Sequence, residues 1–230
     1  YELLRSLVGS EMCIRDRSGH PGGSLSVADV LTYLYFAKMN VDPKNPQMPE
    51  RDRLVLSKGH TAPALYSVLA NRGFFPVEDL KTLRHIGSKL QGHPVMNKVP
   101  GVDMSTGSLG QGISAACGMA LSGKLSNDFY KVYAILGDGE IEEGQVWEAA
   151  MFAAHYRLDN LVAVVDNNGL QIDGRISDVM SPYPIDEKFK AFGWHVISID
   201  AHDFDAIEKA FAEAEKISGQ PTVIIQTVSY

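Results

Sequence analysis

Two polar segments at the ends of apolar runs contain the residue types best suited to chemistry. Gly137–Glu140 follows the apolar run Val132–Leu136, and Asn167–Gly169 closely follows a second apolar run, Leu161–Val165. Apolar runs bounded by Gly and Asn are typical of strands buried on both faces. Asp138 and Asn168 are therefore expected at the carboxyl ends of two strands with a helix between them. Open α/β sheets bind their ligands at that edge.

A carboxylate and a carboxamide offer hard oxygen ligands, which Mg²⁺ and Ca²⁺ prefer. Mg²⁺ usually keeps few protein ligands and completes its octahedron with water and phosphate oxygens. Asp138 and Asn168 together predict a metal-anchored diphosphate. Taken alone, Gly137–Gly139 is also compatible with a strand-to-helix turn in which Asp138 acts as a cap. Leu170 and Ile172, just after Asn168, are compatible with ordinary core residues.

Three of the seven histidines, His20, His60 and His93, follow a glycine in a segment expected to be a loop. Glycine before histidine allows the backbone to approach a ligand closely. Imidazole donates a hydrogen bond or takes a proton near neutral pH. The three side chains are expected to converge on an anionic or hydroxylated substrate. For any single one, a loop histidine serving as a cap or a surface residue is an equal alternative.

A glycine-rich segment at 106–112 leads into a helix rich in small residues. The N-terminus of such a helix can present unpaired N–H groups to a phosphate. The segment is neither a Walker loop nor a dinucleotide fingerprint, because it lacks Gly-Lys-Ser/Thr and no strand directly precedes it. Taken alone, it favours a tight helix-packing turn. Glu143, expected at the start of the next helix, is similarly compatible with a carboxylate that only complements the helix dipole.

The elements expected to position these residues alternate along the chain. Helices are predicted at 26–39, 62–72, 111–125, 143–157, 186–192 and 203–217, and strands at 54–57, 132–137, 161–166, 194–199 and 222–228. A long loop over the site is expected at 85–109, and another from the third strand to about 184. Alternating strands and helices predict an α/β fold with a mostly parallel sheet covered by helices on both faces.

The composition is that of an ordinary globular chain. Of 230 residues, 45% are hydrophobic and 21% charged, and the formal net charge is −7. This charge argues against nucleic acid or an anionic membrane surface as the main partner. Two cysteines provide no disulfide framework, so a reducing compartment, the cytoplasm, is expected. No run approaches the roughly 18 apolar residues needed to span a bilayer.

Both ends of the chain differ from the rest. The stretch Val8–Arg17 resembles a translated sequencing-adapter read-through, which would make residues 1–17 non-native and exclude Cys13. A genuine N-terminal helix is the alternative. The chain stops just after a strand-like run, which suggests a C-terminally truncated domain over residues 18–230.

Six motifs together resemble transketolases, most closely the N-terminal subunit of the split, two-chain form. The resemblance runs from about Ser18 to Thr227. The motifs are Ser18-Gly19-His20-Pro21-Gly22-Gly23-Ser24, Ser57-Lys58-Gly59-His60, Gly92-His93-Pro94, the Gly107–Gly112 loop, Gly137-Asp138-Gly139-Glu140 and Asn167-Asn168-Gly169. The resemblance implies a three-layer thiamine-diphosphate-binding fold that carries the diphosphate and Mg²⁺ half of the cofactor site.

It also implies a role for each matching residue. Metal ligands would be the side chains of Asp138 and Asn168 and the backbone carbonyl of Leu170, with Mg²⁺ replaceable by Ca²⁺ or Mn²⁺. The other residues implied in cofactor binding are His60, Gly107, Ser108, Leu109, Gly139, Glu140 and Ile172. Within this set, His60 and Gly139 would contact the diphosphate, and Leu109 and Ile172 would help hold the cofactor bent. His20 and His93 would hydrogen-bond the sugar and assist proton transfers. Glu143 resembles the carboxylate that links paired active sites at the subunit interface.

The implied reaction transfers a two-carbon ketol unit from a ketose phosphate to an aldose phosphate, as in the pentose phosphate pathway. A C-terminal subunit with the pyrimidine-binding domain would supply an activating glutamate, and the assembly would be a dimer of heterodimers. The alternatives are another thiamine-diphosphate enzyme resembling deoxyxylulose-phosphate synthase, a non-catalytic cofactor-binding partner subunit, and a nucleotide-binding dehydrogenase.

Overall fold

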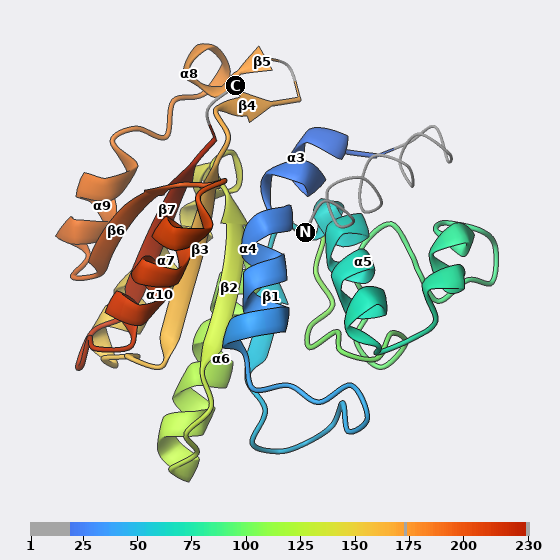
Figure 1. Cartoon of the computed structure of the whole chain (residues 1–230). Helices are drawn as coiled ribbons and strands as arrows, with labels where there is room; N and C mark the ends of the chain where they lie inside the picture. Colours follow the sequence, from blue (N-terminus) through green and yellow to red (C-terminus); the bar gives the residue numbers. More distant parts are fainter. Residues whose placement is uncertain (1–18, 173, 229–230) are drawn as a thin grey trace.

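The central element is a parallel five-stranded sheet (Figure 1). A computed structural model describes residues 19–172 and 174–228, so the expectations about residues 1–17 and Cys13 lie outside the described part of the chain. In spatial order the strands are β1 (Arg53–Leu56), β2 (Val132–Gly137), β3 (Leu161–Asn167), β7 (Thr222–Thr227) and β6 (His195–Asp200). All neighbouring pairs are parallel, which confirms the predicted sheet.

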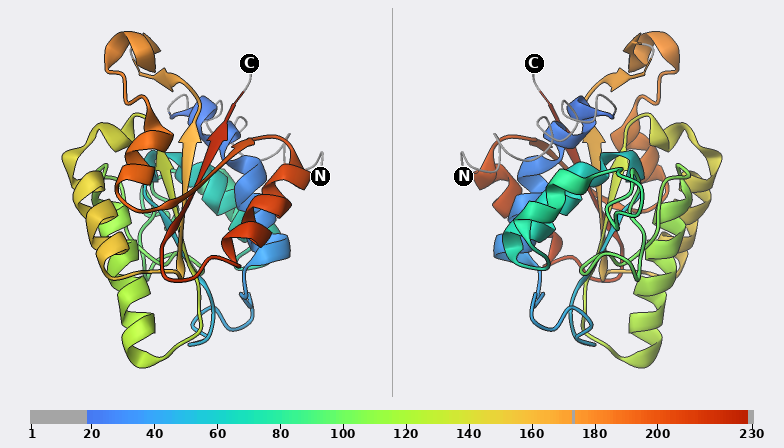
Figure 2. Two further views of the ribbon diagram at one scale, coloured as in Figure 1. Left: turned by 90° about the vertical axis from the view of Figure 1, so that its left-hand side faces the viewer. Right: turned by 90° about the vertical axis from the view of Figure 1, so that its right-hand side faces the viewer.

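Helices cover both faces of this sheet and make a three-layer structure (Figure 2). One layer contains α4 (Ala28–Tyr33), α5 (Ala62–Arg72) and α10 (Phe204–Ala214), and the opposite layer contains α6 (Gln111–Ser126), α7 (Gly144–His155) and α9 (Ile185–Ala191). Successive strand residues point to opposite faces. Accordingly Tyr133 and Ile135 pack in the first layer's core, whereas Ala134 and Leu136 pack in the second. Residues 132–136 of β2 and 161–165 of β3 are apolar because both faces of these strands are buried.

The structure differs from the predicted elements mainly at two places. The helix predicted at 26–39 begins earlier, as α3 (Pro21–Ser26), breaks at Val27, and ends in the π-helical turn η1 (Leu34–Lys38). Pro21 is a favourable first residue for a helix, but the Gly-Gly pair after it has low helix propensity and concealed the start.

The second difference lies between β3 and α9, where only a loop was predicted. This segment contains the antiparallel pair β4 (Leu170–Gln171) and β5 (Gly174–Arg175), followed by α8 (Ile176–Val179). Three short 3₁₀ turns complete the described elements: η2 (Gly59–Thr61), η3 (Val77–Thr82) and η4 (Glu140–Glu142). None of the helices within residues 19–172 and 174–228 has the length and apolar character required to cross a membrane.

Candidate functional site

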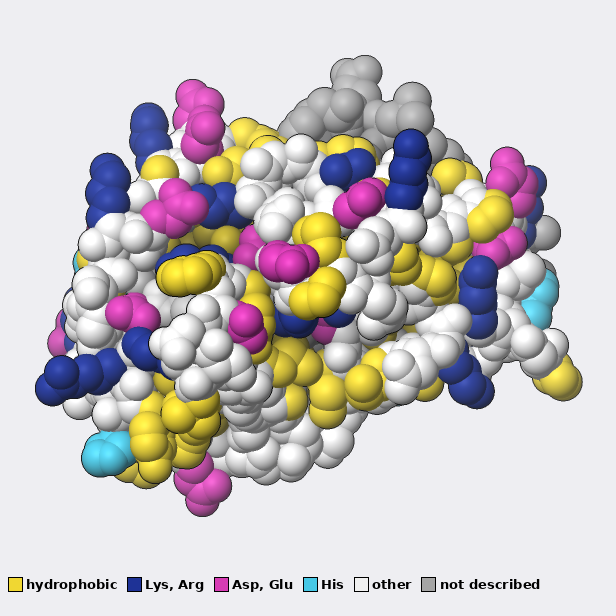
Figure 3. Space-filling model, turned by 90° about the horizontal axis from the view of Figure 1, so that it is seen from below, with side chains coloured by type: hydrophobic (Ala, Val, Ile, Leu, Met, Phe, Trp, Pro, Cys, Tyr) yellow, Lys and Arg dark blue, Asp and Glu magenta, His cyan; other side chains and the backbone are white. Residues whose placement is uncertain are grey.

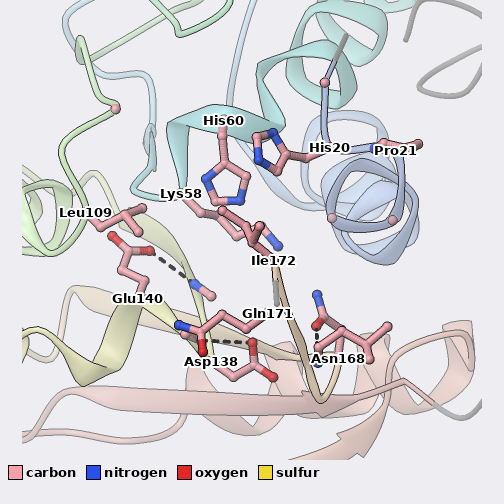
Figure 4. Close-up of a pocket in the computed structure, with 17 residues that line it drawn as sticks. His20, Pro21, Lys58, His60, Leu109, Asp138, Glu140, Asn168, Gln171 and Ile172 are labelled. Carbon is pink, nitrogen blue, oxygen red and sulfur yellow. Dashed lines mark hydrogen bonds between the residues drawn. The ribbon is translucent and has the colours of Figure 1, made fainter. Parts of the chain in front are cut away.

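A cavity of about 610 Å³ opens at the carboxyl ends of β1, β2 and β3 (Figure 4). Its walls are the loops that follow these strands, the start of α3, the glycine-rich loop before α6 and the β4–β5 segment. The predicted site residues that line it are His20, His60, Gly107, Leu109, Asp138, Gly139, Glu140, Asn168, Leu170 and Ile172. His93, Ser108 and Glu143 are not among the lining residues. The sequence-based expectation that Asp138 and Asn168 meet at one edge of the sheet is therefore confirmed.

Backbone hydrogen bonds hold Asp138 at this edge. One carboxylate oxygen, Oδ1, accepts from its neighbour Gly139 N at 2.9 Å, and Oδ2 accepts from Gly169 N at 2.7 Å. Gly169 has a φ of 70°, which favours glycine. The turn after β3 is thus tied directly to the residue that ends β2. Asp138 belongs to this link between strands and does not cap a helix.

The electrostatic environment of Asp138 also favours a bound cation. The residue is only 2% exposed, and within the described residues no ion pair is formed by its carboxylate. Burial, with a further contribution from the charge of Asp166, raises the pKa of Asp138 to about 6. A buried carboxylate without a counter-ion is stabilised by a metal ion. Asn168 adds an amide oxygen to the same cavity, so the donor set fits a hard divalent cation.

Two of the three predicted histidines line the cavity together. The ring centroids of His20 and His60 are 4.7 Å apart. Burial, reinforced by the charge of Lys58, lowers the pKa of His60 to about 4. Burial and the charge of Arg84 also lower the pKa of His20. Both rings are therefore neutral at neutral pH, and each can donate one hydrogen bond and accept another.

The third histidine, His93, is exposed and lies beside the glycine-rich loop. A Cβ built on Gly107 would be 2.9 Å from His93 Cδ2, so the loop and the imidazole are in close contact. A Cβ on Gly59 would similarly be 2.7 Å from Thr106 Oγ1. These two glycines allow the segments that carry His60 and His93 to approach the same loop.

The glycine-rich segment acts as a packing turn, which is the interpretation that the sequence favoured. A Cβ on Gly112 would lie 2.5 Å from Ser57 Oγ and 2.6 Å from Ser57 Cα. The N–H of Gly110, at the start of α6, donates to Glu140 Oε1 at 2.9 Å. This donor is consequently satisfied by protein, and α6 packs directly on the turn after β1.

Glu140 organises the cavity wall through both of its carboxylate oxygens. Besides Gly110 N, Oε1 accepts from the hydroxyl of Ser57, and Oε2 accepts from Gly137 N at 3.1 Å. The residue is 2% exposed, and burial raises its pKa. Glu140 was predicted to bind cofactor; the structure shows that its carboxylate joins the turns after β1 and β2 to the start of α6.

Sequence reasoning assigned no role to Lys58, Asp166 or Gln171. Lys58 and Gln171 line the cavity, and Lys58 Nζ forms a buried ion pair with Asp166. Gln171 Nε2 donates to Glu142 Oε2 at 3.2 Å. The sequence offered only one indication of a role for Lys58 and Asp166, their positions next to motifs. Lys58 lies inside the Ser57–His60 motif, and Asp166 lies just before the Asn167–Gly169 motif.

The apolar and acidic residues around the rim complete the site. Leu170 is 49% exposed and Ile172 is 86% exposed, so neither is the core residue that the sequence also allowed. Glu143 is exposed at the N-cap of α7, without a side-chain cap hydrogen bond. Its Cβ is 2.9 Å from the position that a Cβ on Gly110 would take. Ser108 is exposed outside the cavity lining.

Comparisons with protein families, with individual proteins and with solved structures all identify transketolases as similar to this chain. The family described as "Transketolase, thiamine diphosphate binding domain" matches residues 3–229. The 6-deoxy-6-sulfo-D-fructose transketolase subunit SqwG of a Clostridium species is 53% identical over 207 residues, covering 90% of this chain and 75% of that protein. One of the subunits of apulose-4-phosphate transketolase from Phocaeicola vulgatus is 42% identical over 215 residues, covering 94% of this chain and 76% of that protein.

Single-chain proteins match over a smaller part of their own length. Mouse transketolase is 47% identical over 212 residues, covering 90% of this chain but 33% of that protein. The solved structure of transketolase from Leishmania mexicana superposes with a TM-score of 0.92 at 33% identity, covering 97% of this chain and 35% of that one.

Proposed function

The chain belongs to the transketolase family, as the N-terminal, thiamine-diphosphate-binding subunit of the split form, and we propose that it performs ketol transfer together with a C-terminal partner subunit. The reaction moves a two-carbon unit from a ketose phosphate to an aldose phosphate. The two subunit relatives are named for different ketoses, so the proposal concerns the transfer step that the names have in common. The proposed setting is the pentose phosphate pathway in the cytoplasm.

The observation that supports this function is the joint contribution of Asp138 and Asn168 to one cavity. We assign to them, with the backbone carbonyl of Leu170, a Mg²⁺ ion that binds the diphosphate of the cofactor; Ca²⁺ or Mn²⁺ can substitute. The buried, unpaired carboxylate of Asp138 supports the assignment, because an adjacent dication offsets the cost of its burial.

The family resemblance gives the other lining residues roles that their places in the cavity allow. His60 and Gly139 would contact the diphosphate, and Gly107 and Leu109 would meet the aminopyrimidine, with the neighbouring Ser108 at the loop surface. Ile172 and Leu109 would help to hold the cofactor. When bound, thiamine diphosphate supplies the stabilisation of a carbanion on the transferred two-carbon unit.

The histidines and Glu143 act outside the metal site. His20 is an exposed imidazole that lines the cavity, where it can hydrogen-bond a sugar hydroxyl or relay a proton. His93, beside Gly107, is assigned the same work on the sugar. Exposed Glu143 is assigned to the contact between subunits in a dimer of heterodimers, where the partner's pyrimidine-binding domain would complete the site.

The decisive experiment is a calorimetric titration of thiamine diphosphate into this chain reconstituted with its partner subunit, with Mg²⁺ and then with EDTA. We expect binding that requires Mg²⁺, together with ketol transfer from a ketose phosphate to an aldose phosphate. Binding without turnover would favour a non-catalytic, cofactor-binding subunit. Absence of binding would refute the proposed function.

A further inference from the structure

A buried polar network surrounds the carboxylate of Asp166, at the end of β3. Asp166 is fully buried and accepts hydrogen bonds on both oxygens. Oδ1 accepts from Gln226 Nε2 at 3.0 Å. Oδ2 accepts from Lys58 Nζ, from the hydroxyl of Ser26 and, at 3.3 Å, from Asn168 Nδ2. The side-chain amide of Asn168, a residue of the proposed metal site, therefore donates a hydrogen bond to this buried carboxylate.

The side-chain amide of Asn168 has an oxygen, Oδ1, and an NH₂ group, Nδ2, and only the oxygen can coordinate a cation. Nδ2 donates to Asp166, and Oδ1 accepts from Leu170 N at 2.9 Å. Both partners require this orientation, because a carboxylate only accepts and a backbone N–H only donates. A flipped amide would place its oxygen against Asp166 and its NH₂ against Leu170 N–H. The network thus selects the oxygen for the side of the amide away from Asp166.

We propose that Asp166 is a positioning residue that fixes the amide orientation of Asn168 and so keeps Oδ1 available as a ligand for the divalent cation. The inference rests on the proposed function, since the cation is the one assigned to the diphosphate. Asp166 itself does not line the cavity. It acts through Asn168, as outer-shell carboxylates act on the ligands that they orient.

Lys58 makes this arrangement electrostatically possible. Its side chain is 2% exposed and that of Asp166 is 0% exposed, so the two charges compensate each other inside the protein. Lys58 and Asn168 both donate to the same oxygen, Oδ2, so the ion pair also holds the carboxylate where the amide reaches it.

The test is an exchange of the carboxylate and the amide between positions 166 and 168, in the reconstituted pair of subunits. In Asp166→Asn, the residue at 166 can accept or donate, so only the N–H of Leu170 still selects the orientation of the Asn168 amide. We expect the Mg²⁺ concentration for half-maximal thiamine diphosphate binding to rise about tenfold or more. In the double variant Asp166→Asn/Asn168→Asp, residue 168 presents an oxygen in either orientation, and we expect the requirement to return to within about threefold of the wild type.

Gln226→Leu is the matched control, because Gln226 donates to the other carboxylate oxygen, Oδ1, and to the carbonyl of Ser26, and neither bond involves Asn168. It should lower the melting temperature without changing the Mg²⁺ requirement. An unchanged Mg²⁺ requirement in Asp166→Asn would overturn the inference, provided that the wild-type pair binds the cofactor. A wild-type pair that fails to bind would refute the proposed function instead.

The double variant also distinguishes positioning from a structural role. A structural role predicts that the double variant binds Mg²⁺ no better than the single variant, because the network is altered in both. Circular dichroism reports folding in each case. If Asp166→Asn does not fold, the double variant decides, since it retains the carboxylate and amide groups and the total charge. A double variant that neither folds nor binds Mg²⁺ would overturn the inference.

Discussion

At the scale of single residues, the proposed chemistry depends most on Asp138. Its carboxylate is nearly inaccessible, is held by two backbone N–H groups and is without a counter-ion among the described residues. The raised pKa means that the charged form is less favourable in the folded chain than in the unfolded one. At neutral pH this carboxylate therefore costs stability, as expected for a residue retained for ligand binding.

Asp138→Ala should abolish Mg²⁺-dependent binding of thiamine diphosphate while the fold is retained. The substitution removes a metal ligand, and the lost backbone hydrogen bonds are offset by removal of a buried charge. Calorimetry measures binding, and thermal denaturation measures stability. The control is Asp186→Ala, which removes a partly exposed carboxylate on α9 that pairs with Lys190. An unchanged cofactor affinity in Asp138→Ala would mean that the metal assignment is wrong.

His93→Ala should slow sugar turnover more than it weakens cofactor binding. The imidazole lies beside Gly107 and does not line the diphosphate cavity, so its loss should affect the sugar first. The expected fall in kcat/KM is about 100-fold, within the usual range for loss of a proton-transfer group, and the cofactor affinity should change little. His155→Ala, at the far end of α7, is the control. The opposite pattern would place His93 at the cofactor.

At the scale of elements, the site depends on the direct contact between α6 and the turn after β1. The contact requires the absence of a side chain at Gly112, and Glu140 reinforces it by binding both Ser57 and Gly110. The same turn carries Lys58 and His60 into the cavity. The position of α6 consequently determines where the glycine-rich loop meets the histidines.

Gly112→Ala should destabilise the protein by about 1–3 kcal/mol, because the new Cβ would overlap the backbone and side chain of Ser57. Gly118→Ala, in the same helix, is the matched control: apart from the backbone of its own helix, no heavy atom of the described residues lies within 4 Å of its Cβ position. That substitution should stabilise the helix by about 0.5–1 kcal/mol. Urea denaturation of both variants measures the difference. Equal effects would show that α6 does not pack as described.

At the scale of the whole molecule, the cavity has an apolar rim that the described residues leave uncovered. Ile172 and Leu170 project from the β4–β5 segment with 86% and 49% exposure. Seen from below, the opposite end of the molecule carries dispersed charges of both signs (Figure 3). The uncovered rim supports the proposal that another subunit completes the site; the names of two relatives describe those proteins as subunits.

This chain alone, supplied with thiamine diphosphate and Mg²⁺, should transfer no ketol group. The family resemblance places the glutamate that activates the aminopyrimidine in the partner's domain. A coupled assay on the isolated chain, followed by addition of the partner, measures the effect. Robust turnover by the isolated chain would contradict the assignment of a split active site.

The amino-acid sequence by itself determined the α/β class, the positions of the five strands and the meeting of Asp138 with Asn168. These follow from local information, because apolar runs define buried strands and parallel strands end at one edge of the sheet. Even there, the Gly-Gly pair after Pro21 concealed the start of α3, and the short β4–β5 pair left no pattern of its own.

Only the tertiary structure decided which distant groups pair. Lys58 and Asp166 are 108 residues apart, and Ser57 and Glu140 are 83 apart. No local pattern encodes such a pairing, because the hydrogen-bond partner of a buried polar group depends on which strands become neighbours. The spatial order β1-β2-β3-β7-β6 brings these side chains together. The proposed ligand residues can therefore be read from the sequence, whereas the residues proposed to orient them are identified only in the folded sheet.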